Sequence, residues 1–283
     1  MTATLDTRET RWLARFERLD EVGSTNDVVA GWLRDGTPEV CVAIAEVQTS
    51  GRGRNGRTWA APRGAALLLS GGFRPTWLAP EATWRLAAIV SLAMAEACEI
   101  GASVRAGTIR LKWPNDLVAV HPSTGAVRKL AGVLGETDGL GTSDARAVVG
   151  IGVNAGWRPE DFPPELADSM TSLAELAPGA PIDREVVVHV FLQRLERLVG
   201  ELRGGAFPAE AWRARQLTNG LPVRLELPDG TVEEVEAVDV DVETGALIVS
   251  DGDAWSGGAP RSVHVGEIRH LRVGAIPVGA AGV

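Results

Sequence analysis

The sequence predicts an α+β protein with two parts: a large core of strands and helices, and a small antiparallel β module after residue 217. Three observations support this division. Apolar runs typical of buried strands recur up to residue 153, two long segments carry apolar residues at helical spacing, and tight turns separate short strands beyond residue 220. We therefore expect an N-terminal extension (1–19), a main domain (20–217), a small β domain (218–273) and a disordered tail (274–283).

The strands and helices of the main domain follow from these patterns. Apolar runs predict strands over 40–47, 65–73, 108–113, 117–120, 129–136 and 145–153. Helical spacing predicts long helices over 84–97 and 183–203, the second capped by Asp183, and short helices over 170–176 and 209–216. Before these elements, residues 1–20 are charged and carry an apolar pattern too short for a helix-turn-helix domain.

The small module is predicted from turns and alternating strands. We expect strands over 223–227, 231–240 and 246–250, with two more over 262–265 and 270–273. The first two are separated by the turn Pro228-Asp229-Gly230.

The composition is ordinary for a globular protein of 283 residues, which is long enough to bury a sizeable core. A net charge of −9 and a pI near 5.1 argue against general nucleic-acid binding. Cys41 and Cys98 lie in apolar surroundings and are expected to be buried free thiols, and four scattered histidines without CxxC argue against zinc. Because the sequence shows neither a signal peptide nor a membrane span, we expect a cytoplasmic protein without membrane contact.

The most informative segment is QTSGRGRNGRTW at 48–59, in which Arg52, Arg54 and Arg57 alternate with glycines. No acidic residue occurs from 49 to 74, against the charge of the whole chain. Arginine suits carboxylate and phosphate, and glycine permits close backbone approach, so the segment predicts a mobile anion clamp. A solvated loop and an RGG-like nucleic-acid segment are the alternatives. GRGRNG has the GxGxxG spacing, but no helix opening follows it, so the dinucleotide fingerprint fails.

Other polar residues interrupt the predicted elements. The cluster Ser24-Thr25-Asn26-Asp27 precedes an apolar run and predicts a helix N-cap, which could also bind a neutral polar ligand. Lys112 and Lys129 adjoin patterned strands, where lysine is either a solvated edge charge or a point contact to an anion. We find no Ser-His-Asp set, Cys-His pair or Walker motif, so the residues favour chemistry by positioning and charge stabilisation, as in phosphoryl or adenylyl transfer.

Five motifs, in this order, resemble the catalytic domain of biotin protein ligases: STN (24–26), Q-x-x-GRGRxGRxW (48–59), KWPND (112–116), KLAG (129–132) and GIGxN (150–154). The resemblance covers roughly residues 20–215, and the module after 218 resembles that family's SH3-like domain. It implies a mixed, mainly antiparallel sheet packed with helices, as in the class II synthetase-like biotin–lipoate ligase core, and a small C-terminal SH3-like β-barrel. It also implies a ligase that converts biotin and ATP, with Mg²⁺, to biotinyl-5′-AMP. Biotin is then transferred to a lysine of a biotin carboxyl carrier domain.

The resemblance also implies residue roles. The expected biotin and biotinyl-AMP contacts are Ser24, Thr25, Asn26, Gln48, Arg52, Gly53, Arg54, Lys129 and Gly132. The expected nucleotide-side residues are Trp59, Lys112, Asn115 and Asn154. Lys129, Arg54 and Lys112 are the expected catalytic residues, because they would offset repulsion between the carboxylate and the α-phosphate.

Several residues keep a second interpretation. Trp113 is expected in the core, and Arg57 and Arg63 are expected to be solvated. Asp116 is either a turn residue or an indirect metal contact, and no metal ligand is predicted.

Two departures and two alternatives limit the comparison. Only about twenty residues precede STN, so we expect no DNA-binding winged helix and no repression, and the turn at 120–128 is somewhat long for the family. A lipoate or octanoate ligase or transferase is the nearest alternative, against which GRGRxGR and KWPND count. The other is a non-catalytic anion- or nucleic-acid-binding module, against which the acidic pI counts.

Overall fold

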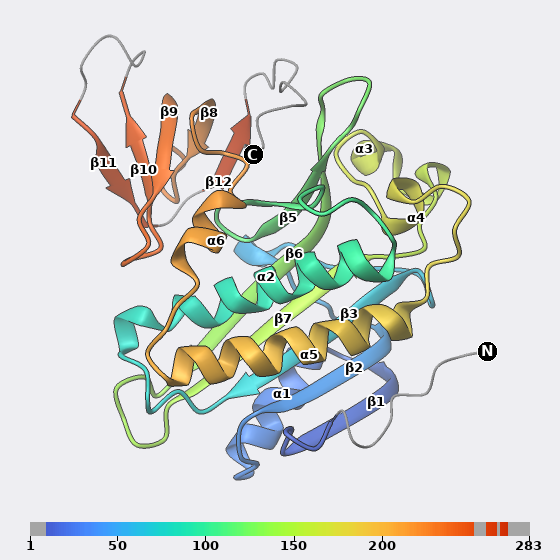
Figure 1. Cartoon of the computed structure of the whole chain (residues 1–283), viewed down its shortest axis with the longest axis vertical. Helices are drawn as coiled ribbons and strands as arrows, with labels where there is room; N and C mark the ends of the chain where they lie inside the picture. The colour runs from blue at the N-terminus through green and yellow to red at the C-terminus, as the bar shows by residue number, and fades with distance from the viewer. Residues whose placement is uncertain (1–9, 252–258, 265–266, 271–283) are drawn as a thin grey trace.

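The structure is a computed structural model that describes residues 10–251, 259–264 and 267–270, and its largest element is a seven-stranded sheet (Figure 1). Its strands are β1 (Arg15–Val22), β2 (Cys41–Gln48), β3 (Ala66–Phe73), β4 (Arg110–Lys112), β5 (Asp116–Val120), β6 (Val127–Asp138) and β7 (Arg146–Asn154). Their order across the sheet is β1-β2-β3-β7-β6-β5-β4. Only the β1–β2 pair is parallel within this sheet, so the expected mixed, mainly antiparallel sheet is confirmed.

Strand β1 was not predicted, and the expected domain boundary at residue 20 falls inside it. Its apolar residues Phe16, Leu19 and Val22 recur every third position, so the sequence lacks the period of two that marks a half-buried strand. The strand forms one edge of the sheet, where half-exposed charged side chains are normal.

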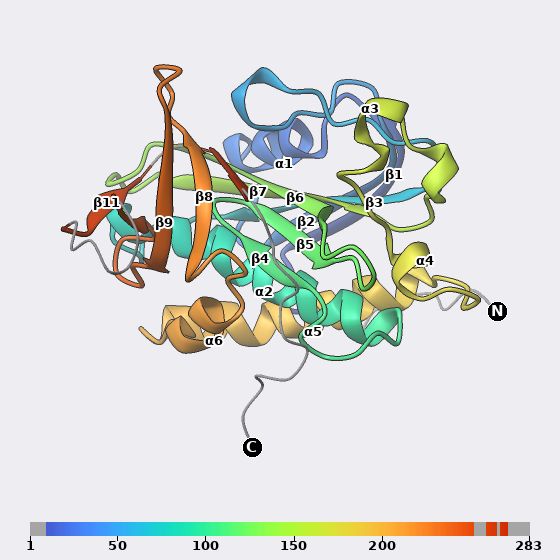
Figure 2. The ribbon, with the colours of Figure 1, turned by 90° about the horizontal axis from the view of Figure 1, so that it is seen from above.

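Helices cover both faces of this sheet (Figure 2). They are α1 (Thr25–Arg34), α2 (Trp84–Gly101), α3 (Pro164–Ala167), α4 (Leu173–Leu176), α5 (Arg184–Arg203) and α6 (Ala209–Ala214), with short 3₁₀ helices η1 (Arg54–Gly56), η2 (Pro80–Ala82) and η3 (Pro159–Asp161). Helices α2 and α5 pack together on one face, and α1 packs on the other against β2, β3 and β7. As predicted, the Asp183 side chain caps α5 by accepting bonds from the backbone N–H groups of Glu185 and Val186.

The C-terminal module is a five-stranded antiparallel sheet with a buried apolar side, consistent with the expected small barrel-like domain. Its strands are β8 (Leu221–Glu226), β9 (Val232–Val240), β10 (Leu247–Ser250), β11 (Arg261–Val263) and β12 (Glu267–His270), in the order β11-β10-β9-β8-β12. The expected last strand at 270–273 lies outside the described residues except for His270, and the expected disordered tail lies wholly outside them.

The turn between β9 and β10 joins the small sheet to the large core. Gly245 has a φ of +74°, and a Cβ there would lie 2.7 Å from the Trp84 ring of α2. The indole N–H of Trp113 donates to the Gly245 carbonyl at 3.1 Å, and Trp113 is 4% exposed, so its predicted core position is confirmed. The small sheet and the main domain therefore pack directly against each other at this turn.

Both cysteines are buried free thiols, as predicted. Burial raises the pKa of Cys41 to about 11 and also raises the pKa of Cys98. Within the described residues, we find no helix with the length and apolar character needed to cross a membrane. Over the same part of the chain, His, Cys, Asp and Glu side chains form no group of three or more suited to a metal ion.

Candidate functional site

Two adjoining chambers lie beside the Gly/Arg loop (residues 49–59), which links β2 to the segment before β3. The inner chamber has a volume of about 710 Å³, and its wall includes the start of α1, the end of β2 and the middle of β6. The outer chamber has a volume of about 940 Å³ and opens between the loop, α2 and the β9–β10 turn. Both include the loop and the KWPND segment in their walls.

One end of the inner chamber is neutral and polar. Gln48 Oε1 accepts two hydrogen bonds from Thr25, from the backbone N–H at 2.7 Å and from the hydroxyl at 2.9 Å. Ser24 occupies the N-cap position of α1, but its side chain makes no capping hydrogen bond, and Ser24 is 4% exposed. The Ser24 side chain therefore does not cap the helix, and Ser24 lines the chamber.

Asn26 lines this polar end, and Ser70 lies behind it, outside the chamber wall. The Ser70 hydroxyl lies 2.7 Å from Thr25 Oγ1 and 2.6 Å from Asn26 Oδ1, and its single proton can serve one of them at a time. Asn26 Nδ2 donates to Glu136 Oε2 at 2.5 Å. A Cβ at Gly150 would lie 2.2 Å from Asn26 Oδ1, so this glycine makes room for the network.

The Gly/Arg loop folds back on itself as a small hairpin. Arg52 and Thr58 form an isolated antiparallel bridge, the Gly53 N–H donates to the Arg57 carbonyl at 2.7 Å, and the Trp59 N–H donates to the Gly51 carbonyl at 2.9 Å. A Cβ at Gly51 would lie 2.3 Å from the Trp59 carbonyl oxygen, so only glycine permits this close approach.

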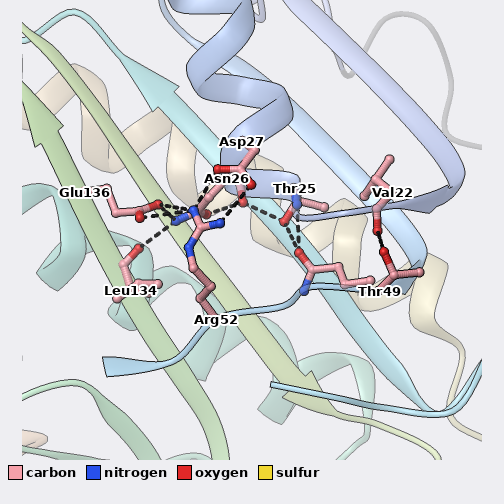
Figure 3. Close-up of polar contacts among 10 residues, drawn as sticks. Val22, Thr25, Asn26, Asp27, Thr49, Arg52, Leu134 and Glu136 are labelled. Atoms are coloured by element: carbon pink, nitrogen blue, oxygen red, sulfur yellow. Dashed lines mark hydrogen bonds and ion pairs between the residues drawn. The ribbon is translucent and has the colours of Figure 1, made fainter. Parts of the chain in front are cut away.

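Arg52 ties the loop to two other elements (Figure 3). Its Nη1 and Nη2 each donate to the Asp27 carboxylate at 2.8 Å, and Nη2 also contacts the two carboxylate oxygens of Glu136 at 3.1 and 3.2 Å. The adjacent guanidinium lowers the pKa of Asp27, and hydrogen bonding to Asp27 raises that of Arg52.

The other end of the inner chamber is cationic and centres on Lys129. Its Nζ lies 2.7 Å from Asp116 Oδ1 and 5.6 Å from the centroid of the Trp59 ring, within range of a cation–π contact. A Cβ at Gly132 would lie 3.1 Å from the same Nζ, so the glycine makes room for the lysine. The backbone of Lys129 is also fixed, because its N–H donates to the Ser169 carbonyl at 2.7 Å.

Arg54 and Lys112 belong to the same cationic end, and both line both chambers. Arg54 Nη1 donates to Asn115 Oδ1 at 3.4 Å, and Asn115 Nδ2 donates to the Val133 carbonyl at 2.8 Å. These contacts join the tip of the loop to the segment between β4 and β5.

The structure brings together all the predicted site residues except Asn154 along the inner chamber. Asn154 is 4% exposed, donates to the Thr171 carbonyl at 3.1 Å, and lies outside the walls of both chambers. Trp59 does line the inner chamber, and it packs so tightly on β7 that a Cβ at Gly152 would lie 2.5 Å from its ring.

Four residues around the site had no definite role in the sequence analysis: Asp27, Ser70, Asp116 and Glu136. Ser70 carried a usable signal, because a hydroxyl inside the apolar strand β3 must find a partner once it is buried. Asp27 and Glu136 carried none, since their pairing with Arg52 depends on how distant elements meet.

The chemistry of the inner chamber follows from its two ends. The polar end offers hydroxyl and amide groups to a neutral head group, and the cationic end offers Lys129, Lys112 and Arg54 to anions. A chamber of this form suits a ligand with a neutral polar head and a carboxylate tail, held beside a phosphate.

Comparison with known proteins identifies relatives of the chain. The family model for the biotin/lipoate A/B protein ligase family matches residues 20–154. A biotin–[acetyl-CoA-carboxylase] ligase of Mycobacterium tuberculosis is 35% identical over 255 residues, which cover 89% of this chain and 87% of that protein. The bifunctional ligase/repressor BirA of Escherichia coli (strain K12) is 30% identical over 247 residues, or 85% of this chain and 71% of BirA.

The fold also matches solved structures. The biotin protein ligase from Aquifex aeolicus in complex with biotin and ATP superposes with a TM-score of 0.71 at 25% identity, covering 90% of this chain and 99% of that chain.

Proposed function

This chain belongs to the biotin/lipoate A/B protein ligase family, and we propose that it activates biotin with ATP and transfers it to a lysine of a biotin carboxyl carrier domain. The single observation that carries the assignment to this site is the inner chamber, which joins a neutral polar end to a cationic end within one cavity. Biotin has a neutral ureido head and a carboxylate tail, so its two ends correspond to the two ends of the chamber.

In the proposed binding mode, Ser24, Thr25 and Gln48 hydrogen-bond the ureido group, and the carboxylate points to Lys129. Asn26 lines the same end and mainly orients its neighbours, because Glu136 and the Ser70 hydroxyl already contact its two polar atoms. The nucleotide lies on the side of Trp59, Lys112 and Asn115, which belong to the same chamber. Asn154 acts indirectly, through the backbone of the segment that it anchors at Thr171.

The first step joins two anions. A carboxylate oxygen of biotin attacks the α-phosphorus of ATP, the bond from that phosphorus to the bridging oxygen breaks, and pyrophosphate leaves with the electron pair. Lys129, Arg54 and Lys112 offset the repulsion between the reactants and stabilise the charge that develops. Asp116 and the Trp59 ring hold the Lys129 ammonium in place, so its orientation is set before the reaction.

In the second step, the neutral amine of a carrier lysine attacks the acyl carbon of biotinyl-5′-AMP. The acyl–oxygen bond breaks, AMP leaves, and the amine loses its proton as the amide forms. The cations that stabilised the first transition state also stabilise the departing phosphate.

Magnesium is proposed to accompany the nucleotide. The described residues hold no group of three potential metal ligands, and Asp116, the nearest carboxylate to the cationic end, is paired with Lys129. These residues fit an ion held mainly by phosphate oxygens and water, with Asp116 as an outer contact. When bound, Mg²⁺ neutralises the pyrophosphate leaving group.

Lipoate is the nearest alternative substrate. Its dithiolane ring carries no strong hydrogen-bonding groups, so it would leave the polar end of the chamber without a matched ligand. The relatives named as biotin–[acetyl-CoA-carboxylase] ligases, which the chain matches over 87% and 82% of their length, also favour biotin. The absence of a DNA partner remains a prediction from the acidic pI and the lack of a winged-helix segment before STN, and the cytoplasmic location remains a prediction from the lack of a signal peptide and of a membrane span.

The assay that tests this function measures pyrophosphate release with ATP and Mg²⁺ in the presence of biotin, lipoate or neither. We expect release that depends on biotin, together with labelling of a carrier domain. Folded protein that releases pyrophosphate only with lipoate, or with neither acid, would overturn the assignment.

A further inference from the structure

We infer that Asp27 and Glu136 are positioning residues that hold Arg52 as a latch, keeping the Gly/Arg loop closed over the inner chamber. The inference rests on the proposed function in one respect, namely that the ligand retained by the closed loop is biotinyl-5′-AMP. Family resemblance assigned Arg52 to the ligand, and Asp27 and Glu136 had no assigned role.

The geometry of Arg52 supports the latch. Its guanidinium forms a two-pronged contact with Asp27 at the start of α1 and reaches Glu136 on β6 with the same Nη2 (Figure 3). Both elements contribute residues to the wall of the inner chamber, as does the loop that follows β2. A two-pronged arginine–carboxylate contact fixes direction as well as distance, so it holds the first half of the hairpin in one orientation.

Charge separates Arg52 from the other cations of the site. Two carboxylates contact its single positive charge, so the cluster of Arg52, Asp27 and Glu136 has a formal charge of −1. Such a cluster offers an incoming carboxylate or phosphate little attraction. Arg54 and Lys129, each in contact with groups of KWPND, are better placed to bind the reacting anions.

The latch is connected to the polar end of the chamber. Glu136 accepts from Asn26 as well as from Arg52, Asn26 meets the Ser70 hydroxyl, and Ser70 meets Thr25. Thr25 in turn donates to Gln48. A head group bound to Thr25 or Gln48 therefore orders side chains that also hold the latch, which links recognition of the ligand to closure of the loop.

The test uses Asp27→Asn, Glu136→Gln and the double variant, with Asp138→Asn as the matched control. Asp138 is on the same strand as Glu136 and pairs with Arg146 at 2.8 Å, away from both chambers. Two readouts are measured: trypsin cleavage after Arg54 and Arg57, and release of preformed biotinyl-5′-AMP after dilution. We expect the double variant to raise both rates roughly fivefold, and the control to stay within about twofold of wild type.

Salt and thermal measurements separate a latch from a general structural role. Raising NaCl from about 0.05 to about 0.5 M should speed release more in wild type than in the double variant. Salt screens the contacts of Lys129 and Arg54 with the ligand in both proteins, whereas the ion pairs of the latch are present only in wild type. The melting temperature of the double variant should stay within about 4 °C of wild type, since exposed ion pairs contribute little to global stability.

The outcomes distinguish the latch from the proposed function. Unchanged cleavage and release in the double variant, with biotinyl-5′-AMP still formed, would overturn the latch and leave the function intact. Faster cleavage of the loop in the double variant, when folded wild-type protein itself makes no biotinyl-5′-AMP, would support the latch and overturn the function. Equal acceleration by Asp138→Asn would also overturn the latch.

Discussion

Arg52 and Lys129 are both cations held by carboxylates, but their surroundings differ. Lys129 lies on strand β6, its side chain is 26% exposed, and its Asp116 partner is 20% exposed. Arg52 lies on a loop, its side chain is 38% exposed, and its partners Asp27 and Glu136 are 61% and 43% exposed. Ion pairs of the second kind are weak and easily screened, whereas a partly buried pair on a strand is more persistent.

This difference fits a division of labour. A charge that stabilises a transition state must be in place beforehand, which favours a strand and a shielded partner. A charge that closes a loop must also release it on every catalytic cycle, which favours a weak, exposed pair. The following predictions test this contrast, from the largest expected effect to the smallest.

Replacing Lys129 by alanine should have the largest effect. We expect biotin-dependent pyrophosphate release to fall about 100-fold, equivalent to about 2.7 kcal/mol, because a cation beside the reacting anions is lost. Arg63→Ala is the control, since Arg63 pairs with Asp20 and lines neither chamber. Near-normal pyrophosphate release by the Lys129 variant would show that this lysine does not take part in the reaction, and the proposed difference in role between Lys129 and Arg52 would be wrong.

Gly152→Ala should rank second. The new Cβ would lie 2.5 Å from the Trp59 ring, so the ring must move. This movement would disturb its cation–π contact with Lys129. We expect kcat/KM for ATP to fall about tenfold, in line with an overpacking cost of 1–3 kcal/mol. Gly200→Ala is the control, because a Cβ there meets nothing within 4 Å and Gly200 lines neither chamber. Equal effects of the two variants would show that Trp59 does not support the cationic end.

Asp116→Asn should have a moderate effect and a different signature from Asp27→Asn. Without a carboxylate partner the Lys129 ammonium is held less firmly, so we expect the adenylation rate to fall about fivefold. Release of biotinyl-5′-AMP should change little in this variant, whereas Asp27→Asn should mainly change release. A quenched adenylation assay measures the rate of biotinyl-5′-AMP formation in each variant, and a dilution assay measures the rate of its release. The contrast fails if both variants change the same rate.

The latch should show almost no pH dependence near neutrality. The Arg52 guanidinium lowers the pKa of Asp27 from its ordinary value of 3.8. A lowered pKa means that the contribution of the pair is fully present above 3.8 and is lost only as the pH falls through the lower, folded value. The contribution of the Asp27–Arg52 pair should therefore be constant from about pH 5 to 8, and it should cause no change in the release rate of biotinyl-5′-AMP over that range. An NMR titration should place Asp27 below 3.8 in wild type and return it upward in Arg52→Ala, and a wild-type midpoint above 3.8 would contradict the pairing.

Much of the fold was predictable because its strands are apolar runs with clear ends. The expected strands at 40–47, 65–73 and 145–153 agree with β2, β3 and β7 to within about a residue. Strand β1 was missed because the partner strand, and not the alternation of its own side chains, defines it. Local patterns cannot report such pairing.

The site was predictable in its residues but less so in their contacts. Motifs located Lys129 and Gln48, and the structure places both on one chamber. The carboxylates that hold Arg52 belong to Asp27 and Glu136, which are separated from it by 25 and 84 positions along the chain. No local sequence pattern therefore identifies them. Asn154 differs from these residues. A motif identified it as a site residue, but its side chain donates to the Thr171 carbonyl and so fixes the backbone of a neighbouring segment.

The contact of Gly245 with Trp84 and Trp113 has a consequence for truncation. Trp84 also packs against Phe207 and Trp212, with ring centroids 5.2 and 5.0 Å apart, so one aromatic cluster extends from α2 to the linker before the small sheet. Removing everything after residue 218 would leave the Trp113 indole N–H without its acceptor and would expose the part of the Trp84 ring that Gly245 contacts. The C-terminal module therefore shields part of the hydrophobic core of the main domain from water. We expect the whole protein to melt in a single cooperative transition.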